Sequence, residues 1–123
     1  MGDESRQSVT GVGGVFFRSR DPKAITAWYV EHLGLPVQPD GTVVFLESRG
    51  AHVWGPFDDD TDYWPAARQW MVNFIVPDLD VMLAQLRSAG VEVDERIEEL
   101  EGIGRFGWAV DPEGNRFELW QPA

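Results

Sequence analysis

The sequence contains no cysteine, which excludes disulfide bridges, thiolate metal sites and cysteine nucleophiles. It has no hydrophobic run near the ~18 residues of a membrane span, and no signal-peptide pattern opens it. We therefore expect no membrane partner and a cytoplasmic location. Basic residues are few, since 10 Lys and Arg face 21 Asp and Glu. The net charge of −11 argues against a nucleic-acid partner; it would suit a cationic ligand, although a soluble acidic surface is the commoner explanation.

Aromatic residues are abundant instead, with 6 Trp and 7 Phe among 123 residues. A chain of this length forms one domain with a hydrophobic core, or two small fused halves. Core packing would use some of these rings, and a ligand pocket would use others.

The expected secondary structure repeats along the chain. A strand at 11–19 precedes a helix that begins at Asp21-Pro22 and ends at Gly34. A strand at 70–76 precedes a helix that begins at Asp78 and ends at Gly90. Three further strands follow each helix, at 35–38, 42–47 and 51–54, and at 91–93, 105–110 and 116–120. In the first helix, Ile25, Trp28, Tyr29 and Leu33 recur at helical spacing, which predicts one buried face.

The repeat indicates an α+β fold made of two βαβββ modules, at 11–57 and 69–123. Each module alone has too little core for stability, so we expect the two to pair. Pairing would form a single domain over 10–123, with a curved, mostly antiparallel sheet and the helices outside. Whether the modules pair within one chain or swap between two chains is left open. Residues 1–9 are predicted to be a flexible tail. The acidic stretch 57–65 between the modules is either a solvated connector or a lid over a pocket.

The closing strand places a carboxylate among apolar residues. Glu118 and Trp120 point to one strand face, while Phe117 and Leu119 point to the other. Matching the last strands of the two modules makes His52 the counterpart of Glu118. Strand parity then predicts an inner face that carries Phe16, Arg18, His52, Trp54, Met71, Asn73, Glu118 and Trp120, with Phe106 and Trp108 on the neighbouring strand.

With these features, the sequence resembles the vicinal oxygen chelate superfamily, which includes glyoxalase I, bleomycin resistance proteins and extradiol dioxygenases. The resemblance covers Val12 to Pro122 and rests on the paired modules, the two helix starts and the ending from Asp111 to Trp120. It implies a small-molecule site on the concave face and a homodimer. It does not specify a reaction, because a fold alone does not fix function.

The resemblance also implies up to four metal ligands, at the positions of Gly14, His52, Met71 and Glu118. Glycine has no side chain and methionine is a soft thioether, so only His52 and Glu118 suit a divalent metal. We therefore predict no metal and no other cofactor. A divalent metal held by His52 and Glu118 is the alternative.

Three functions are compatible with these residues. The first is a binder of a small organic molecule without a complete metal site. The second is a metal-dependent lyase, isomerase or dioxygenase of the glyoxalase type, and the third is a metal-free isomerase or lyase with Glu118 as base. Whether the chain is an enzyme is left open, and so is the identity of the ligand.

The predicted catalytic residues are Glu118 and His52, and the predicted substrate-binding residues are Phe16, Arg18, Trp54, Met71, Asn73, Trp108 and Trp120. Each also has a structural interpretation, as a packed ring, a hydrogen-bonded His or a carboxylate paired with an arginine such as Arg18 or Arg105.

Overall fold

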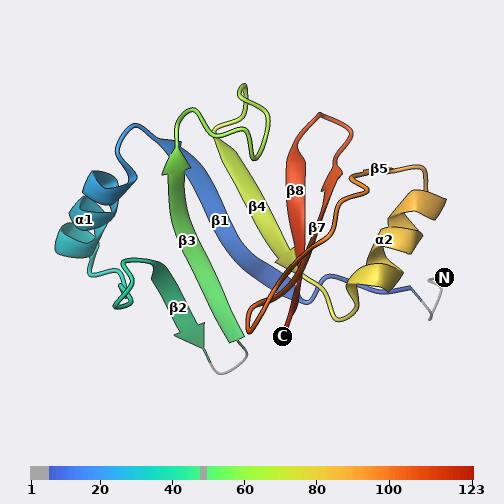
Figure 1. Cartoon of the computed structure of the whole chain (residues 1–123), viewed down its shortest axis with the longest axis horizontal. Coiled ribbons are helices and arrows are strands. Elements are labelled where there is room, and N and C mark those ends of the chain that lie inside the picture. Colours follow the sequence, from blue (N-terminus) through green and yellow to red (C-terminus); the bar gives the residue numbers. More distant parts are fainter. Residues whose placement is uncertain (1–5, 48–49) are drawn as a thin grey trace. The chain divides into compact units, whose positions relative to one another are not determined.

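A computed structural model describes residues 6–47 and 50–123 (Figure 1). Within these residues, eight strands form a mixed sheet and two helices accompany it, which confirms the predicted α+β fold class. The chain divides into two compact units. Unit A is residues 13–72, and unit B is residues 1–12 together with 73–123.

Unit A is formed by β1 (Gly11–Ser19), α1 (Pro22–Leu33), β2 (Val43–Glu47) and β3 (Gly50–Asp58), with the start of β4. β1 pairs with β3 in parallel, and β2 pairs with β3 antiparallel. The predicted strand at 35–38 is reduced to one bridge between Val37 and Val43. The Asp21 side chain accepts the Ala24 N–H at 3.1 Å, and Gly34 ends α1 in the left-handed region, as predicted.

The predicted buried face of α1 is not formed. No residue of α1 is buried, and the side chains of Trp28 and Leu33 are 52% and 62% exposed. Tyr29 instead meets Trp54 of β3, with ring centroids 4.8 Å apart. The rings of Tyr29 and Trp54 therefore lie between α1 and β3, and they keep the smaller side chains of α1 from packing against the sheet.

Unit B is formed by β4 (Trp70–Ile75), α2 (Leu79–Ser88), β5 (Glu92–Val93), β6 (Glu98–Leu100), β7 (Gly104–Val110) and β8 (Arg116–Pro122). β4 pairs with β8 in parallel, whereas β7 pairs antiparallel with β8, β5 and β6. β6 lies in the segment 94–102, which is rich in Asp and Glu. The core of unit B consists of Val76, Leu79, Met82, Leu83 and Leu119. α2 thus has the buried face that α1 lacks.

Residues 1–5 of the predicted tail lie outside the described residues. Gln7 is attached to α2, because its N–H donates to Gln85 Oε1 at 2.8 Å and its side-chain oxygen accepts the Asp78 N–H at 2.8 Å. Within the described residues, no helix is long and apolar enough to cross a membrane.

Candidate functional site

The register of β1 and β3 separates residues that were predicted to share one face. Phe16 pairs with Gly55 and Val15 pairs with Trp54, and paired residues of parallel strands point to the same side, which Phe17 shares with Val15 by strand parity. Trp54 therefore lies with Phe17, at 5.0 Å between ring centroids, on the side of α1. His52 follows Trp54 by parity. The prediction that Phe16 and Arg18 share a face with His52 and Trp54 is thus wrong.

Arg18 supports the loop that follows β3. Its side chain is only 8% exposed, and its guanidinium lies 5.0 Å from the centre of the Trp64 ring. The guanidinium donates five hydrogen bonds of 2.7–3.1 Å to backbone carbonyls. The acceptors are the carbonyl oxygens of Asp59, Thr61, Trp64, Pro65 and Arg68. Arg18 is therefore committed to the loop, which does not suit its predicted role as a substrate-binding residue.

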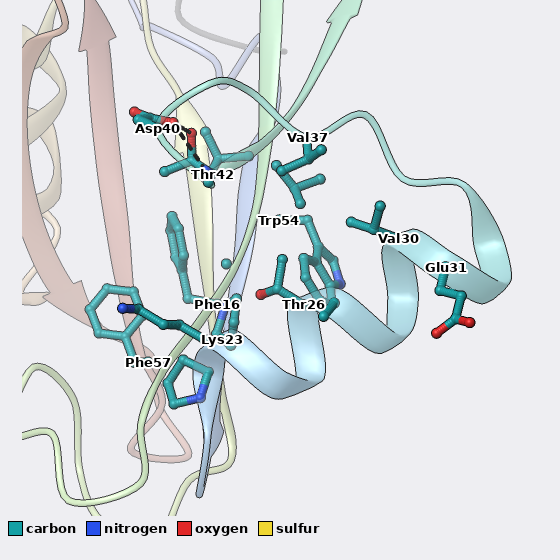
Figure 2. Close-up of a pocket in the computed structure, with 17 residues that line it drawn as sticks. Phe16, Lys23, Thr26, Val30, Glu31, Val37, Asp40, Thr42, Trp54 and Phe57 are labelled. Carbon is teal, nitrogen blue, oxygen red and sulfur yellow. Dashed lines mark hydrogen bonds between the residues drawn. The ribbon is translucent and has the colours of Figure 1, made fainter.

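A pocket of about 740 Å³ lies beside α1 in unit A (Figure 2). We call it the aromatic pocket. It is lined by Phe16, Pro22, Lys23, Thr26, Ala27, Val30, Glu31, Val37, Asp40, Gly41, Thr42, Val43, Val53, Trp54, Gly55, Pro56 and Phe57. Its volume lies within the range of about 300–1,000 Å³ that is usual for small-molecule sites.

The pocket forms where β3 extends past its neighbour. The pairing of β2 with β3 runs from Gly50 to Trp54, so Gly55 to Phe57 continue beyond the β2 ladder. Gly55 has no side chain, and the Phe16 ring occupies the space near it: a Cβ there would lie 3.1 Å from Phe16 Cδ1. Phe16 and Trp54 lie on opposite faces of the β1–β3 pair, yet both line this pocket. Two of the predicted binding residues are therefore found at the same site.

The position of the pocket differs from the predicted one. Its wall includes one flank of α1 and the loop at 37–42, rather than only the sheet face turned away from the helix. The helix and loop residues were not predicted from the sequence, because the ligand positions that the family resemblance implies all lie on strands. One signal was present: α1 has apolar residues on a second flank, at Ala27 and Val30, besides the predicted stripe.

Unit B holds a second cluster, built around a buried carboxylate. Glu118 is 3% exposed, and each of its oxygens accepts a hydrogen bond. Asn73 Nδ2 donates to Oε1 at 2.7 Å, and Trp108 Nε1 donates to Oε2 at 2.9 Å. Strand register explains the cluster, because Glu118 pairs with Asn73 on β4 and with Trp108 on β7. Three predicted site residues are thus brought together.

Two arginines surround the Trp108 ring. The guanidinium carbons of Arg96 and Arg116 lie 4.8 Å and 5.2 Å from its centre, and Arg116 also pairs with Asp94 at 3.2 Å. Two buried atoms of this region, Asn73 Oδ1 and Arg116 Nε, have no hydrogen-bond partner among the described residues. Since Asn73 Nδ2 must face the carboxylate, Oδ1 must point elsewhere.

The donor set of this cluster does not fit a catalytic divalent metal. Both Glu118 oxygens already accept N–H bonds, and its strand partner Asn73 offers one amide oxygen. Within the described ranges, no group of three or more His, Cys, Asp or Glu side chains could hold a metal ion. His52 lies on the α1 side of β3, 3.4 Å from Glu47, whereas Glu118 lies on the face of β8 opposite the core residue Leu119. The predicted equivalence of His52 and Glu118 is therefore wrong.

The remaining predicted residues have structural contacts. Trp120 donates its indole N–H to the Ile103 carbonyl at 2.9 Å and stacks on Phe106, with centroids 6.0 Å apart. Met71 is 1% exposed. Arg105 pairs with Asp80 at 3.0 Å.

The fold and these sites define the class of protein. A glyoxalase-like domain matches residues 14–120, so the chain belongs to the glyoxalase-like domain family, within the vicinal oxygen chelate superfamily. No curated protein matches the sequence.

Solved structures with this fold include methylmalonyl-CoA epimerases. The one from Mycobacterium tuberculosis is 24% identical, with a TM-score of 0.66 over 94% of this chain and 89% of that chain. One from Streptomyces coelicolor, in complex with 2-nitronate-propionyl-CoA, is 19% identical, with a TM-score of 0.74 over 94% and 99%. An NAD-dependent benzaldehyde dehydrogenase from Legionella pneumophila is 16% identical, with a TM-score of 0.62 over 89% and 98%. At these identities the likeness concerns the fold.

Proposed function

We propose that this chain binds a small, largely apolar organic molecule in the aromatic pocket of unit A, and that binding needs no metal ion. The observation that carries the proposal is the pocket itself, about 740 Å³ in volume. The faces of Phe16, Trp54 and Phe57 supply flat apolar surface, and Thr26 and Thr42 supply a few polar groups. Such a combination of apolar wall and sparse polar groups is typical of ligand sites.

The state of α1 supports the same proposal. A helix with no buried residue leaves apolar surface uncovered, at a cost of about 25 cal/mol for each Å². A ligand beside Val30 and Trp54 would cover part of that surface. Ligand binding should therefore stabilise unit A and raise its unfolding temperature.

A blocking variant tests the proposal. Ala27 is an exposed residue of α1 that lines the pocket, so Ala27→Trp would place an indole in the cavity. We expect the affinity for 2-naphthylmethanol, a neutral aromatic probe, to fall at least about ten-fold, as followed by NMR titration. Ala84→Trp is the matched control, because Ala84 is an exposed residue of α2 in unit B. Equal affinities for the two variants would contradict the proposal, as would a wild-type protein that does not bind.

The metal-dependent alternative makes a different prediction. Metal analysis of protein purified without a chelator would then find one divalent ion per chain. The proposal made here predicts far less than one. It is supported by the chemistry of Asn73 and Glu118, which offer a single uncommitted amide oxygen beside a hydrogen-bonded carboxylate.

A further inference from the structure

We propose that the aromatic pocket selects an organic monocation, whose charged group lies beside Asp40 and whose apolar body lies against the rings. This inference rests on the proposed function and names its ligand class. The charged side chains that line the pocket are Asp40, Glu31 and Lys23. The lining thus carries two carboxylates and one ammonium, and Figure 2 shows Asp40 and Lys23 at separate ends of the pocket.

The charge of Lys23 is balanced by its own surroundings. A neighbouring cavity of about 560 Å³ is lined by Lys23 and Arg20 together with Asp21 and Asp58. Two cations and two carboxylates thus meet at that end, so an anionic ligand would gain little there. Among the residues that the structure describes, no arginine lines the aromatic pocket, and Lys23 is its one basic lining residue.

The Asp40 carboxylate is held in place by two hydrogen bonds from Thr42. Its Oδ1 accepts the Thr42 N–H at 3.0 Å and the Thr42 hydroxyl at 2.7 Å. These bonds hold the pKa of Asp40 below its usual value, so the carboxyl group stays ionised at neutral pH. Both bonds end on Oδ1, and Oδ2 accepts no bond from the described residues. Oδ2 can therefore receive an ammonium N–H from a ligand.

The rings of the pocket favour the same class of ligand. The face of an aromatic ring attracts a cation, and Phe16, Trp54 and Phe57 all line the cavity. The net charge of −11 adds a long-range attraction for cations at low ionic strength. The Asp40 carboxylate and the ring faces of the pocket therefore both favour a ligand that joins a positive charge to an apolar body.

Three probes with one aromatic body separate the contributions of charge and apolar contact. 2-Naphthylmethylammonium is a cation, 2-naphthylmethanol is neutral and 2-naphthoate is an anion. We expect the cation to bind about two- to five-fold more tightly than the alcohol at about 10 mM ionic strength, as is usual for one exposed charge pair. The anion should bind most weakly. At about 150 mM ionic strength the preference for the cation should shrink, since screening then acts within about 8 Å.

Asp40→Asn removes the charge but keeps an oxygen that can accept the Thr42 bonds. It should bring the cation's affinity to that of the alcohol when both probes are measured with this variant. Asp62→Asn is the control, because Asp62 is exposed and does not line the pocket. This variant should keep the preference for the cation.

Each outcome is informative. If the alcohol binds as tightly as the cation to the wild-type protein, the ligand class is wrong while the proposed function stands. If Asp62→Asn removes the preference as fully as Asp40→Asn, the acidic surface in general attracts the cation and Asp40 does not select it. If none of the three probes shifts the Trp54 indole resonance, the proposed function itself fails.

Discussion

Replacing Arg18 tests the most concentrated set of contacts in unit A. In Arg18→Met, the apolar stem of the side chain is kept and all five hydrogen bonds to the loop carbonyls are lost. The contact with the Trp64 ring, now 5.0 Å from the guanidinium carbon, loses its charge. We expect the loop at 59–68 to detach from β1.

The size of the effect follows from the number and kind of these bonds. A hydrogen bond to a charged group contributes about 1.5–3 kcal/mol, so five taken separately would exceed the total stability of many domains. Water can hydrate the freed carbonyls, and the buried charge itself had a desolvation cost. We therefore expect Arg18→Met to lower the free energy of unfolding by about 3–5 kcal/mol, the upper range for a single substitution. Arg18→Lys should lose about 2–4 kcal/mol, because an ammonium has three donors and no planar fork.

Urea denaturation would measure the free energy of unfolding, and amide hydrogen exchange would locate the change. Exchange should accelerate at the loop more than in α2, which belongs to unit B. Arg20→Met is the matched control, since Arg20 is exposed and should change stability by less than about 0.5 kcal/mol. A loss below about 1 kcal/mol for Arg18→Met would refute the assigned role.

Two further predictions concern unit B. Trp108→Phe keeps a buried ring but removes the indole N–H that donates to Glu118 at 2.9 Å, so the free energy of unfolding in urea should fall by about 1–3 kcal/mol. The control Trp28→Phe, at an exposed residue of α1, should change it little. Equally small effects of the two variants would show that the bond to Glu118 does not stabilise the fold. The pKa of Asp94 is lowered from 3.8, first by the Arg96 backbone N–H and then by the Arg116 guanidinium. Its stabilising contribution is therefore present above the unfolded-state pKa and is lost as the pH falls through the folded one. Asp94→Asn should lose less stability than the wild type between pH 5 and acid values below 3.8, and an unchanged acid slope would contradict this.

Local signals explain why the fold could be predicted. Asp21 and Asp78 cap the helices through bonds to residues three positions later, and Gly34 ends α1 in a conformation that glycine adopts without strain. These interactions are encoded within a few residues. The same is true of the closing turn, where Asp111 accepts the N–H of Asn115 at 2.9 Å.

The face assignments failed because they depend on register between distant strands. A shift of one residue moves every side chain to the opposite face. β1 and β3 pair as Phe16 with Gly55, a register that matching the last strands of the two modules did not give. His52 was therefore placed on the wrong face, while Asn73 and Glu118 were grouped correctly because both lie on directly paired positions.

The contacts of Arg18 and the aromatic pocket could not be predicted from the sequence, for a second reason. The carbonyls that bind Arg18 lie 41 to 50 residues later in the chain, and backbone acceptors carry no sequence signature. The pocket depends on how far α1 stands from β3, which is set by the packing of Tyr29 on Trp54. A hydrophobic pattern indicates which residues prefer burial, but it does not fix that distance.

The occupancy of the aromatic pocket is tested most directly by one NMR titration. Isotope-labelled protein is titrated with 2-naphthylmethylammonium, and chemical-shift changes are mapped onto the assigned residues. The account predicts saturable shifts at the Trp54 indole and at the amides of Thr26 and Val30, which line the pocket. Shifts confined to the Trp120 and Trp108 indoles of unit B, or no saturable shifts, would contradict it.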